Sequence, residues 1–269
     1  MIIIGEKING SIPSVAKAIE ERDEKFIRRL AKRQAEAGAD YIDVCASVSD
    51  DKELETMKWL IDIVQDTVDT PICIDSPNPR ICVDSIPFCN KPGIINSVSL
   101  EGDKIDVIFP VIAKTDWQVI ALLCDNHGIP STVEKRLNIA REIMAKADEF
   151  GIEHSRIYID PLVIALATDG ETMKKFQACT SQIKEWYPEV HVTSGLSNIS
   201  FGLPARKIIN MAFMVLAMNA GMDSAIVDPL NRDMLGLILA TDALIENDEY
   251  CLNYIKAFRQ GRIGNATKK

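Results

Sequence analysis

The sequence has little of what marks a protein that binds nucleic acid, membrane lipid or a structural metal. Its 269 residues carry a net charge of −9 without a cluster of Lys or Arg, which argues against partners with a phosphate backbone or an anionic lipid surface. No charge-free apolar run reaches the roughly 18 residues of a membrane-spanning helix. The three histidines form no His-x-His or His-x-x-x-His pair, and no Cys-x-x-Cys occurs. No tightly bound metal is therefore expected.

Cysteine is present, but not in the pattern of a disulfide framework. Seven cysteines are scattered along the chain, and an odd, unpaired set is typical of reduced thiols in a cytoplasmic protein. We expect these thiols to be buried, and we interpret Cys45, Cys73 and Cys124, which lie in apolar runs, as core residues rather than nucleophiles. The apolar start, Met1–Ile4, is too short for a signal peptide, and no charged region precedes it. These features predict a cytoplasmic location.

Nucleotide-binding and serine-hydrolase motifs are also missing. No Gly-x-Gly-x-x-Gly follows an early strand, and the chain holds neither a Walker phosphate loop nor a Gly-x-Ser-x-Gly elbow. What is present is an alternation of short apolar runs with longer amphipathic stretches, which is the pattern of an α/β protein with a parallel sheet. The eight predicted strands are Met1–Ile4, Tyr41–Cys45, Ile72–Ile74, Ile94–Asn96, Val119–Leu123, Ile157–Ile159, Val190–Thr193 and Ala225–Val227.

Amphipathic stretches of helical period separate these strands. They include Asp23–Gly38, Asp51–Val68, Thr132–Gly151 and Gly170–Tyr187. Eight such units in about 250 residues predict a (β/α)8 barrel, or TIM barrel, as a single domain over residues 1–262. Residues 263–269 are expected to form a disordered tail. The competing fold, a Rossmann-like sheet, is disfavoured because its glycine motif is missing.

A carboxylate or carboxamide residue stands at the carboxyl end of every predicted strand, where the active sites of such barrels lie. A helix cap or a tight turn explains any one of them, but eight together indicate a ring of hydrogen-bond acceptors. Each carboxylate can accept two parallel N–H bonds, so the ring suits an electron-poor heterocycle such as a pterin. A magnesium site among these acids stays open as an alternative. The eight residues are Glu6, Asp43, Asp75, Asn96, Asp125, Asp160, Asn198 and Asp228.

The loop after the seventh predicted strand carries neutral polar groups and leads into an apolar helical stretch, Ile208–Ala220. Ser197 and Asn198 place a hydroxyl and an amide beside the backbone N–H groups of this loop. That combination suits a site that polarises a nitrogen or an oxygen of a heterocycle. The other interpretation is a helix cap, since Ser and Asn are common before helices and Pro204 suits a first helical turn.

Six short segments, in order and spread over nearly the whole chain, form a combination that is specific although each is weak alone. They are Gly5–Gly10, Ala37–Asp43, Ile72–Ser76, Ile95–Ser99, Ile159–Leu162 and Gly195–Pro204. Together they resemble the methyltetrahydrofolate–corrinoid methyltransferases, pterin-binding barrels related to the folate domain of cobalamin-dependent methionine synthase. One departure follows Asp43, where that family often has Asp-x-Asn and this chain has Asp43-Val44-Cys45.

The resemblance implies roles for particular residues. Asp75, Asn96 and Asp160 would hold the pterin ring, and Asn198 would reach pterin N5 and donate a hydrogen bond there as charge develops. The remaining candidates for substrate contact are Gly195 and Ser197, followed by Glu6, Asp43, Arg206 and Asp228.

The implied activity is the transfer of a methyl group between N5 of tetrahydrofolate and the cobalt of a corrinoid. The corrinoid is expected on a separate protein, because Asp125-Asn126-His127-Gly128 only begins a corrinoid-binding Asp-x-His-x-x-Gly motif, and Pro130 occupies the required glycine. Arg206 and Lys207 are candidates to offset the negative glutamate tail of folate. The family also implies a homodimer.

Two alternatives stay open. A dihydropteroate synthase-like enzyme also binds a pterin in a barrel, although the Asn-x-Thr-x-Asp-Ser-Phe start of those enzymes is absent here. A noncatalytic folate-binding subunit of a corrinoid methyl-transfer system would bind folate without transferring a methyl group.

Overall fold

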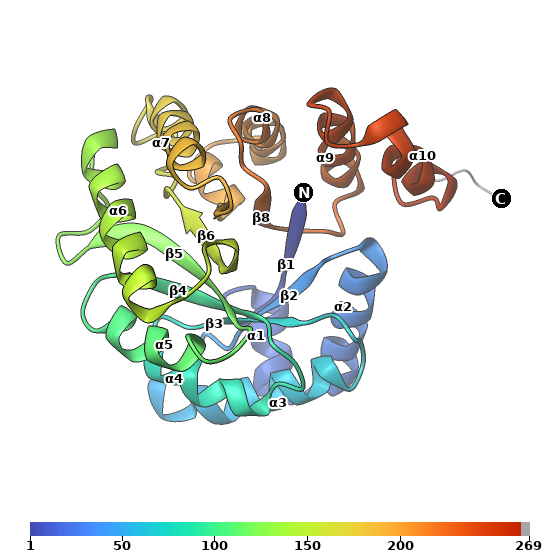
Figure 1. Cartoon of the computed structure of the whole chain (residues 1–269). Coiled ribbons are helices and arrows are strands. Elements are labelled where there is room, and N and C mark those ends of the chain that lie inside the picture. The colour runs from blue at the N-terminus through green and yellow to red at the C-terminus, as the bar shows by residue number, and fades with distance from the viewer. Residues whose placement is uncertain (265–269) are drawn as a thin grey trace.

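Eight parallel strands form a barrel that is surrounded by helices (Figure 1). The structure is a computed structural model and describes residues 1–264. Strands β1 to β7 pair in sequence order, and β8 pairs with β1. Backbone bonds from Asp223 N to Val192 O and from Ile226 N to Ser194 O join the last two strands. The predicted TIM barrel is therefore confirmed. Its strands are β1 (Ile2–Asn9), β2 (Tyr41–Cys45), β3 (Ile72–Asp75), β4 (Ile94–Leu100), β5 (Gln118–Asp125), β6 (Ile157–Asp160), β7 (His191–Val192) and β8 (Ser224–Val227).

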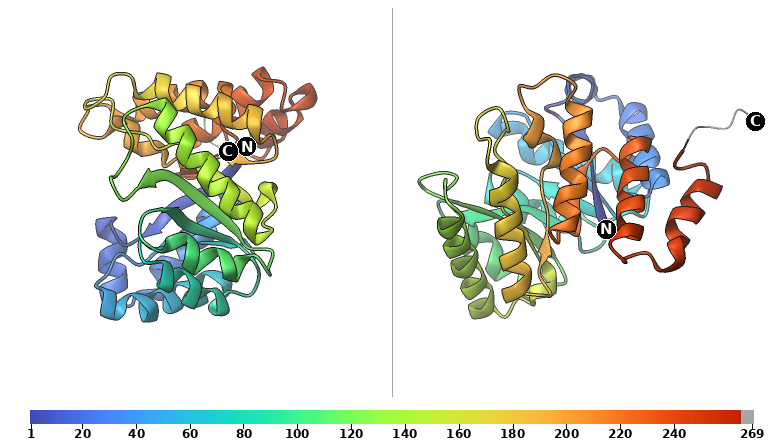
Figure 2. Two further views of the ribbon diagram at one scale, coloured as in Figure 1. Left: turned by 60° about the vertical axis from the view of Figure 1, so that its left-hand side comes forward. Right: turned by 90° about the horizontal axis from the view of Figure 1, so that it is seen from above.

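Helices cover the outside of the barrel, and α7 to α10 lie side by side in the view from above (Figure 2). Over residues 1–264, every helix is too short or too polar to cross a membrane. The α-helices are α1 (Pro13–Glu20), α2 (Glu24–Ala37), α3 (Asp50–Gln65), α4 (Pro79–Ser85), α5 (Lys104–Ile112), α6 (Val133–Phe150), α7 (Thr172–Trp186), α8 (Arg206–Asn219), α9 (Arg232–Leu244) and α10 (Leu252–Arg259). Short 3-10 turns are η1 (Ile86–Phe88), η2 (His154–Arg156), η3 (Leu196–Ser200) and η4 (Glu249–Cys251).

Local sequence signals account for the ends of several helices. Asp23 accepts a hydrogen bond from the backbone N–H of Phe26 at the start of α2, and Thr132 caps α6 in the same way. Both helices end at glycines, Gly38 and Gly151, in the left-handed region, which L side chains rarely adopt. The side-chain caps fix where each helix begins, and the glycines fix where the chain leaves it to return to the barrel.

One layer of side chains fills the middle of the barrel. Ile4, Cys73, Ile94, Ile120 and Tyr158 come from five strands and form a cluster separate from the large core between strands and helices. Successive side chains of a strand point to its two faces in turn. The residue two positions further along each strand therefore also points into the barrel, one layer nearer the carboxyl ends.

Some details differ from the expectations. Strands β1 and β4 run on past Glu6 and Asn96, so these residues lie inside strands. Five thiols are buried as expected, but Cys251 is exposed and Cys89 is half-buried. Ile263 is 3% exposed and its carbonyl accepts a hydrogen bond from Arg232, so packing continues past the boundary expected at residue 262. Residues 265–269 of the expected tail lie outside the described residues.

Candidate substrate site at the barrel mouth

A polar layer closes the barrel toward its carboxyl end. Glu6, Asp75, Asn96 and Asp160 stand two positions after interior residues of the middle layer, so they share its inward face. Asp43 and Asp228 stand two positions after Tyr41 and Ile226, which pack against that layer. The sequence places six of the eight predicted strand-end residues together in this layer, because the strand period of two carries an apolar residue and then a polar one to the same side.

Asp43, Asp75 and Asn96 form one side of the layer. Asp75 and Asn96 are direct register partners of β3 and β4, and the Asn96 amide donates to Asp43 Oδ1 at 3.4 Å. Burial, together with the neighbouring charge of Asp75, raises the pKa of Asp43 well above its usual value. Burial also raises the pKa of Asp75 to about 6. The fold thus holds two acids where a ligand that donates N–H bonds would stabilise their ionised forms.

Asp160 connects the layer to the loop after β7. Its Oδ1 accepts from Leu162 N at 2.8 Å, and its Oδ2 accepts from Gly195 N at 3.3 Å. Burial raises the pKa of Asp160 to about 6, and these two backbone bonds oppose that rise. The residue is 5% exposed, and the two backbone donors orient its carboxylate before any ligand arrives. A carboxylate oxygen can accept more than one hydrogen bond, so each of these oxygens keeps acceptor capacity for a second N–H donor.

Asn198 lies on the 3-10 turn η3 and is exposed at the mouth. A side chain added at Gly195 would meet its Nδ2 atom at 3.2 Å, so the amide stands over the loop that Asp160 binds. The helix-cap interpretation is wrong, because α8 begins at Arg206 behind Ala205 and has no side-chain cap. Pro204 likewise lies before the helix and not in its first turn.

Arg206 holds this turn in place. Its guanidinium donates to Ser197 O at 2.8 Å and to Ser200 Oγ at 3.0 Å. Lys207 forms an ion pair with Asp233. Ser197 therefore contributes its carbonyl to the support of η3, and both basic residues named for the folate tail already have partners on the protein.

Glu6 and Asp228 continue the layer on β1 and at the end of β8, next to Lys7. The Lys7 ammonium lies 3.3 Å from Asp228 Oδ2, and Asp228 Oδ1 also accepts from Leu230 N at 2.9 Å. Burial, with the charge of Asp228, raises the pKa of Glu6 to about 7. Lys7 and Arg206 oppose that rise.

Asp125 does not belong to the layer. Leu122 occupies the inward position of β5, and Asp125 accepts a hydrogen bond from His127 N at 2.7 Å in its own turn. The turn explanation weighed for the strand-end residues holds here. For the magnesium alternative, the described part of the chain shows no group of three or more His, Cys, Asp or Glu side chains arranged to hold a metal ion.

Sequence reasoning missed Arg136, which is fully buried on α6. Its guanidinium donates to Pro130 O, Pro161 O and Leu162 O at 2.7–2.9 Å. It therefore ties the loop after β5 to the loop after β6. The signal was visible: Arg136 stands at helical spacing with the buried Ile139, Ala140 and Ile143, on a face that should be apolar.

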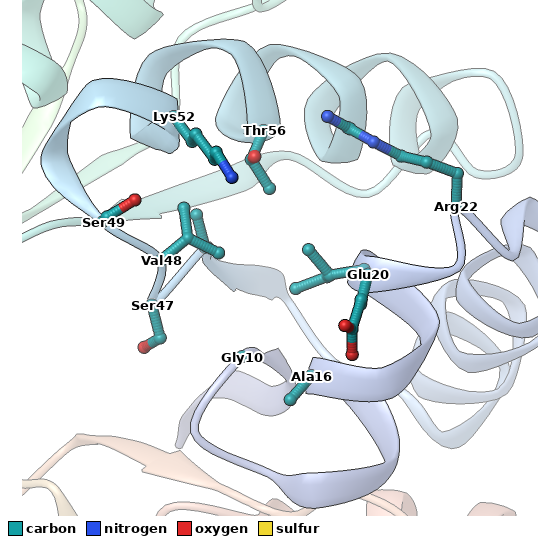
Figure 3. A pocket seen from close by; sticks show the side chains of 11 residues that line it. Gly10, Ala16, Glu20, Arg22, Ser47, Val48, Ser49, Lys52 and Thr56 are labelled. Atoms are coloured by element: carbon teal, nitrogen blue, oxygen red, sulfur yellow. The ribbon is translucent and has the colours of Figure 1, made fainter.

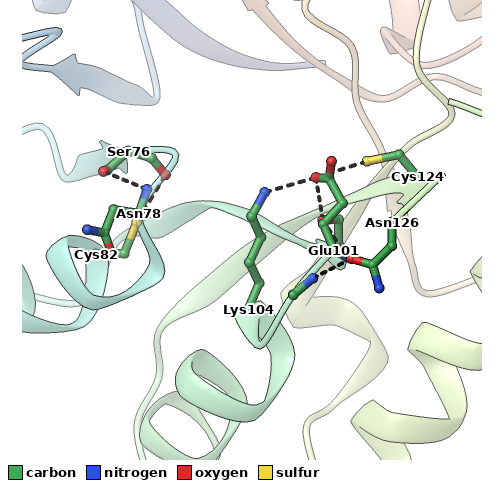
Figure 4. Close-up of polar contacts among 9 residues, drawn as sticks. Ser76, Asn78, Cys82, Glu101, Lys104, Cys124 and Asn126 are labelled. Atoms are coloured by element: carbon green, nitrogen blue, oxygen red, sulfur yellow. Dashed lines mark hydrogen bonds and ion pairs between the residues drawn. The ribbon is translucent and has the colours of Figure 1, made fainter. Parts of the chain in front are cut away.

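Two acids outside the predicted set also brace the mouth loops. Glu101 accepts from Ser99, Lys104 and Cys124, the last at 3.5 Å (Figure 4). Glu53 is buried and accepts from the Ser76 hydroxyl at 2.7 Å. Neither acid follows a predicted strand directly, so a search of strand ends alone passes over both.

A pocket of 340 Å³ opens beside the ends of β1 and β2 (Figure 3). Its lining includes Glu20, Arg22, Ser47 and Lys52, and none of its lining residues belongs to the polar layer. The convergence of polar side chains in the barrel mouth marks the candidate site, because oriented polar groups, and not volume, determine what a site recognises.

A TIM barrel with this inward polar layer at its carboxyl end has the architecture of a barrel enzyme for a small polar substrate. The chain belongs to the family of pterin binding enzymes, which matches residues 7–228.

Comparison with individual proteins narrows this class. The chain is 55% identical to methylcorrinoid:tetrahydrofolate methyltransferase of Eubacterium limosum, over 100% of both chains. It is 31% identical to methionine synthase of Mycobacterium leprae, over 86% of this chain and 21% of that protein. Dihydropteroate synthase from Xanthomonas albilineans shares the fold with a TM-score of 0.68 at 18% identity, over 91% of this chain and 92% of that one. The Yersinia pestis enzyme gives 0.66 at 17%, over 91% and 94%.

Proposed function

We propose that this protein transfers a methyl group between N5 of tetrahydrofolate and the cobalt of a corrinoid carried by a separate protein. The observation that carries the proposal is the full-length 55% identity to a methylcorrinoid:tetrahydrofolate methyltransferase. The polar layer supplies the chemistry that such a substrate needs. Dihydropteroate synthases share the fold at 17–18% identity, which supports no shared activity.

Methylation of tetrahydrofolate is a displacement at carbon. The N5 lone pair attacks the methyl carbon, the carbon–cobalt bond breaks with both electrons going to cobalt, and N5 loses its proton. In reverse, cobalt(I) attacks the methyl carbon and N5 leaves as an amine that must gain a proton. The protein's task is to hold the pterin, to orient N5 toward the open mouth and to offset charge at N5.

Asp75, Asn96 and Asp160 are proposed to bind the pterin ring. The amino-pyrimidinone edge presents N–H donors, and ionised carboxylates are strong acceptors for them. Asp160 is the best-ordered acceptor because Leu162 N and Gly195 N fix both of its oxygens. The remaining acids of the polar layer are proposed to line the same site. They are Glu6, Asp43 and Asp228.

Asn198 is proposed to donate its side-chain amide to N5. It is exposed where a partner can approach, and its turn is held by Arg206. The hydrogen bond from the amide to N5 is weak in the ground state and becomes stronger as negative charge develops at N5. A preorganised donor lowers the activation barrier in this way. The proton itself comes from solvent or from bound water.

The test is an anaerobic assay with tetrahydrofolate and methylcobalamin, following the cobalt spectrum and the formation of 5-methyltetrahydrofolate. We expect product in proportion to cobalt(I) released. Binding of folate without product would instead indicate the noncatalytic subunit. Product from pyrophosphorylated pterin and para-aminobenzoate would indicate the dihydropteroate synthase-like alternative.

We also propose a cytoplasmic homodimer. Seven free cysteines support a reducing compartment. Large exposed apolar side chains on the last two helices and their connection support association of two copies; they are Leu244, Tyr250, Leu252 and Phe258. Light scattering at micromolar concentration should give twice the 29.8 kDa of the chain. A monomeric mass would contradict the dimer.

A further inference from the structure

Four large apolar side chains are exposed at the carboxyl end of the barrel. Ile129 follows β5, and Leu166 follows β6. Two residues come after β7: Phe201 directly follows η3, and Ile208 lies in the first turn of α8. Their exposed fractions are 45%, 37%, 68% and 70%. We call these four residues the apolar rim. Ile129, Leu166 and Phe201 lie in the segments that follow three consecutive strands, and Ile208 lies in the first turn of α8; Asn198 belongs to the same β7–α8 segment as Phe201.

The loops of the apolar rim are tied to one another. Arg136 joins the loop of Ile129 to the loop of Leu166 through three backbone carbonyls. Leu166 N donates to Ile199 O at 2.9 Å, which joins the second loop to η3. The Arg206 guanidinium lies over the Phe201 ring at 6.0 Å. Large apolar side chains that are both exposed and held in place mark contact surfaces.

The apolar rim lies where the second substrate must arrive. Phe201 is three residues from Asn198, and its backbone N–H donates to Asn198 O at 3.1 Å. A cobalt atom that exchanges a methyl group with N5 beside Asn198 is the centre of a wide corrin macrocycle. Because the macrocycle is wide, it must cover the surface around Asn198 when its cobalt approaches N5. Its two faces are apolar, and its periphery carries methyl groups and amides. The polar layer deeper in the barrel offers no such apolar contact.

We infer that the apolar rim, led by Phe201 and Leu166, binds the corrin ring itself and sets its position over the pterin site. This inference rests on the proposed methyl transfer. The two substrates then contact different parts of the barrel mouth. The inward carboxylates recognise the folate, and the apolar rim after β5, β6 and β7 recognises the corrinoid. Free methylcobalamin should therefore use the same surface as a protein-bound corrinoid.

The test measures methyl transfer from free methylcobalamin to tetrahydrofolate for Phe201→Ser, Leu166→Ser and the conservative Phe201→Leu. Loss of the apolar contact should raise KM for methylcobalamin about tenfold in each Ser variant. The value of kcat and the Kd for tetrahydrofolate should stay within about twofold of the wild type, while Phe201→Leu should restore most of the affinity. The unchanged folate Kd shows that η3 has kept its shape.

Leu216→Ser is the matched control, because Leu216 is 52% exposed on α8 but about 15 Å along the helix from its first turn. It should leave KM for methylcobalamin unchanged. A wild-type KM in both Ser variants overturns the role of the apolar rim while the methyl transfer itself stands. A wild-type enzyme that transfers no methyl group overturns the proposed function instead. An equal rise in the Leu216 variant would show a general loss of apolar surface and would also overturn the inference.

Discussion

Replacing Asp75 with Asn should stabilise the ligand-free protein at neutral pH while weakening its binding of folate. Burial raises the pKa of Asp75 from 3.8 to about 6, so the folded chain holds this proton to higher pH than the unfolded chain does. The folded state then binds more protons between about pH 4 and 6, and its stability falls as pH rises through that range. The full cost of the ionised carboxylate is present above pH 6 and absent below pH 4.

The size of the effect follows from the pKa. Each pH unit between the folded and unfolded values corresponds to about 1.4 kcal/mol, which gives about 3 kcal/mol for Asp75 as an upper bound. Asp75 is only half-buried by its accessible surface, so solvent screening lowers the expected gain to about 1–2 kcal/mol. For a chain of this size that gain raises Tm by about 2–6 °C. Loss of a charged acceptor should weaken tetrahydrofolate binding about tenfold to a hundredfold.

Thermal melts of the wild type and Asp75→Asn at pH 7.5 and pH 4.5, with a folate titration at pH 7.5, measure all three quantities. The Tm advantage should shrink at the lower pH, where the wild-type carboxyl is protonated. A variant that is less stable than the wild type at pH 7.5 and binds folate normally would refute the reasoning, because Asp75 would then be a structural residue.

Further outcomes follow from neighbouring residues. Asn198→Ala should slow methyl transfer by about 10²–10³-fold with little change in the Kd for folate. Asn198→Asp should also be slow at pH 7 and should recover in part at lower pH. Fast methyl transfer by the Asp variant at pH 7, measured by stopped-flow, would defeat the donor role. Because the pKa values of Asp75 and Asp160 are about 6, folate affinity measured by titration should be constant above about pH 7 and should fall below pH 6; affinity that rises on acidification contradicts this. Arg136→Met removes the donor of three backbone carbonyls, of which the Pro161 contact is buried, and should lower the free energy of unfolding by about 2–4 kcal/mol in urea melts. A change under about 1 kcal/mol would show that the loops hold without this side chain.

Much of the fold was predictable because apolar strands and amphipathic helices have different periods. All eight strands were located, but their lengths were not, since the polar ends of β1 and β4 continue the ladder. The inward layer was predictable for the same reason: Ile4 and Glu6, or Tyr158 and Asp160, differ by two positions. The expectation that Asp125 joins this layer was wrong. Strand β5 runs three residues past its inward Leu122, so Asp125 lies beyond the layer.

The residues that support the polar layer and the mouth loops were harder to predict than the position of the layer itself. Arg136 and Glu101 act through contacts with backbone or side chains on other loops, and sequence separation hides such partners. The apolar rim is hidden for another reason: an exposed Phe and a buried Phe look alike until the fold shows which loops reach the surface.

The most direct test of the central claim is a single-turnover mixing of the protein with 5-methyltetrahydrofolate and cobalt(I) cobalamin under anaerobic conditions. We predict that the cobalt(I) spectrum converts to that of methylcobalamin, with a rate that saturates in folate and with one tetrahydrofolate formed for each methyl transferred. A rate no faster than in the absence of protein, at saturating folate, would contradict the account.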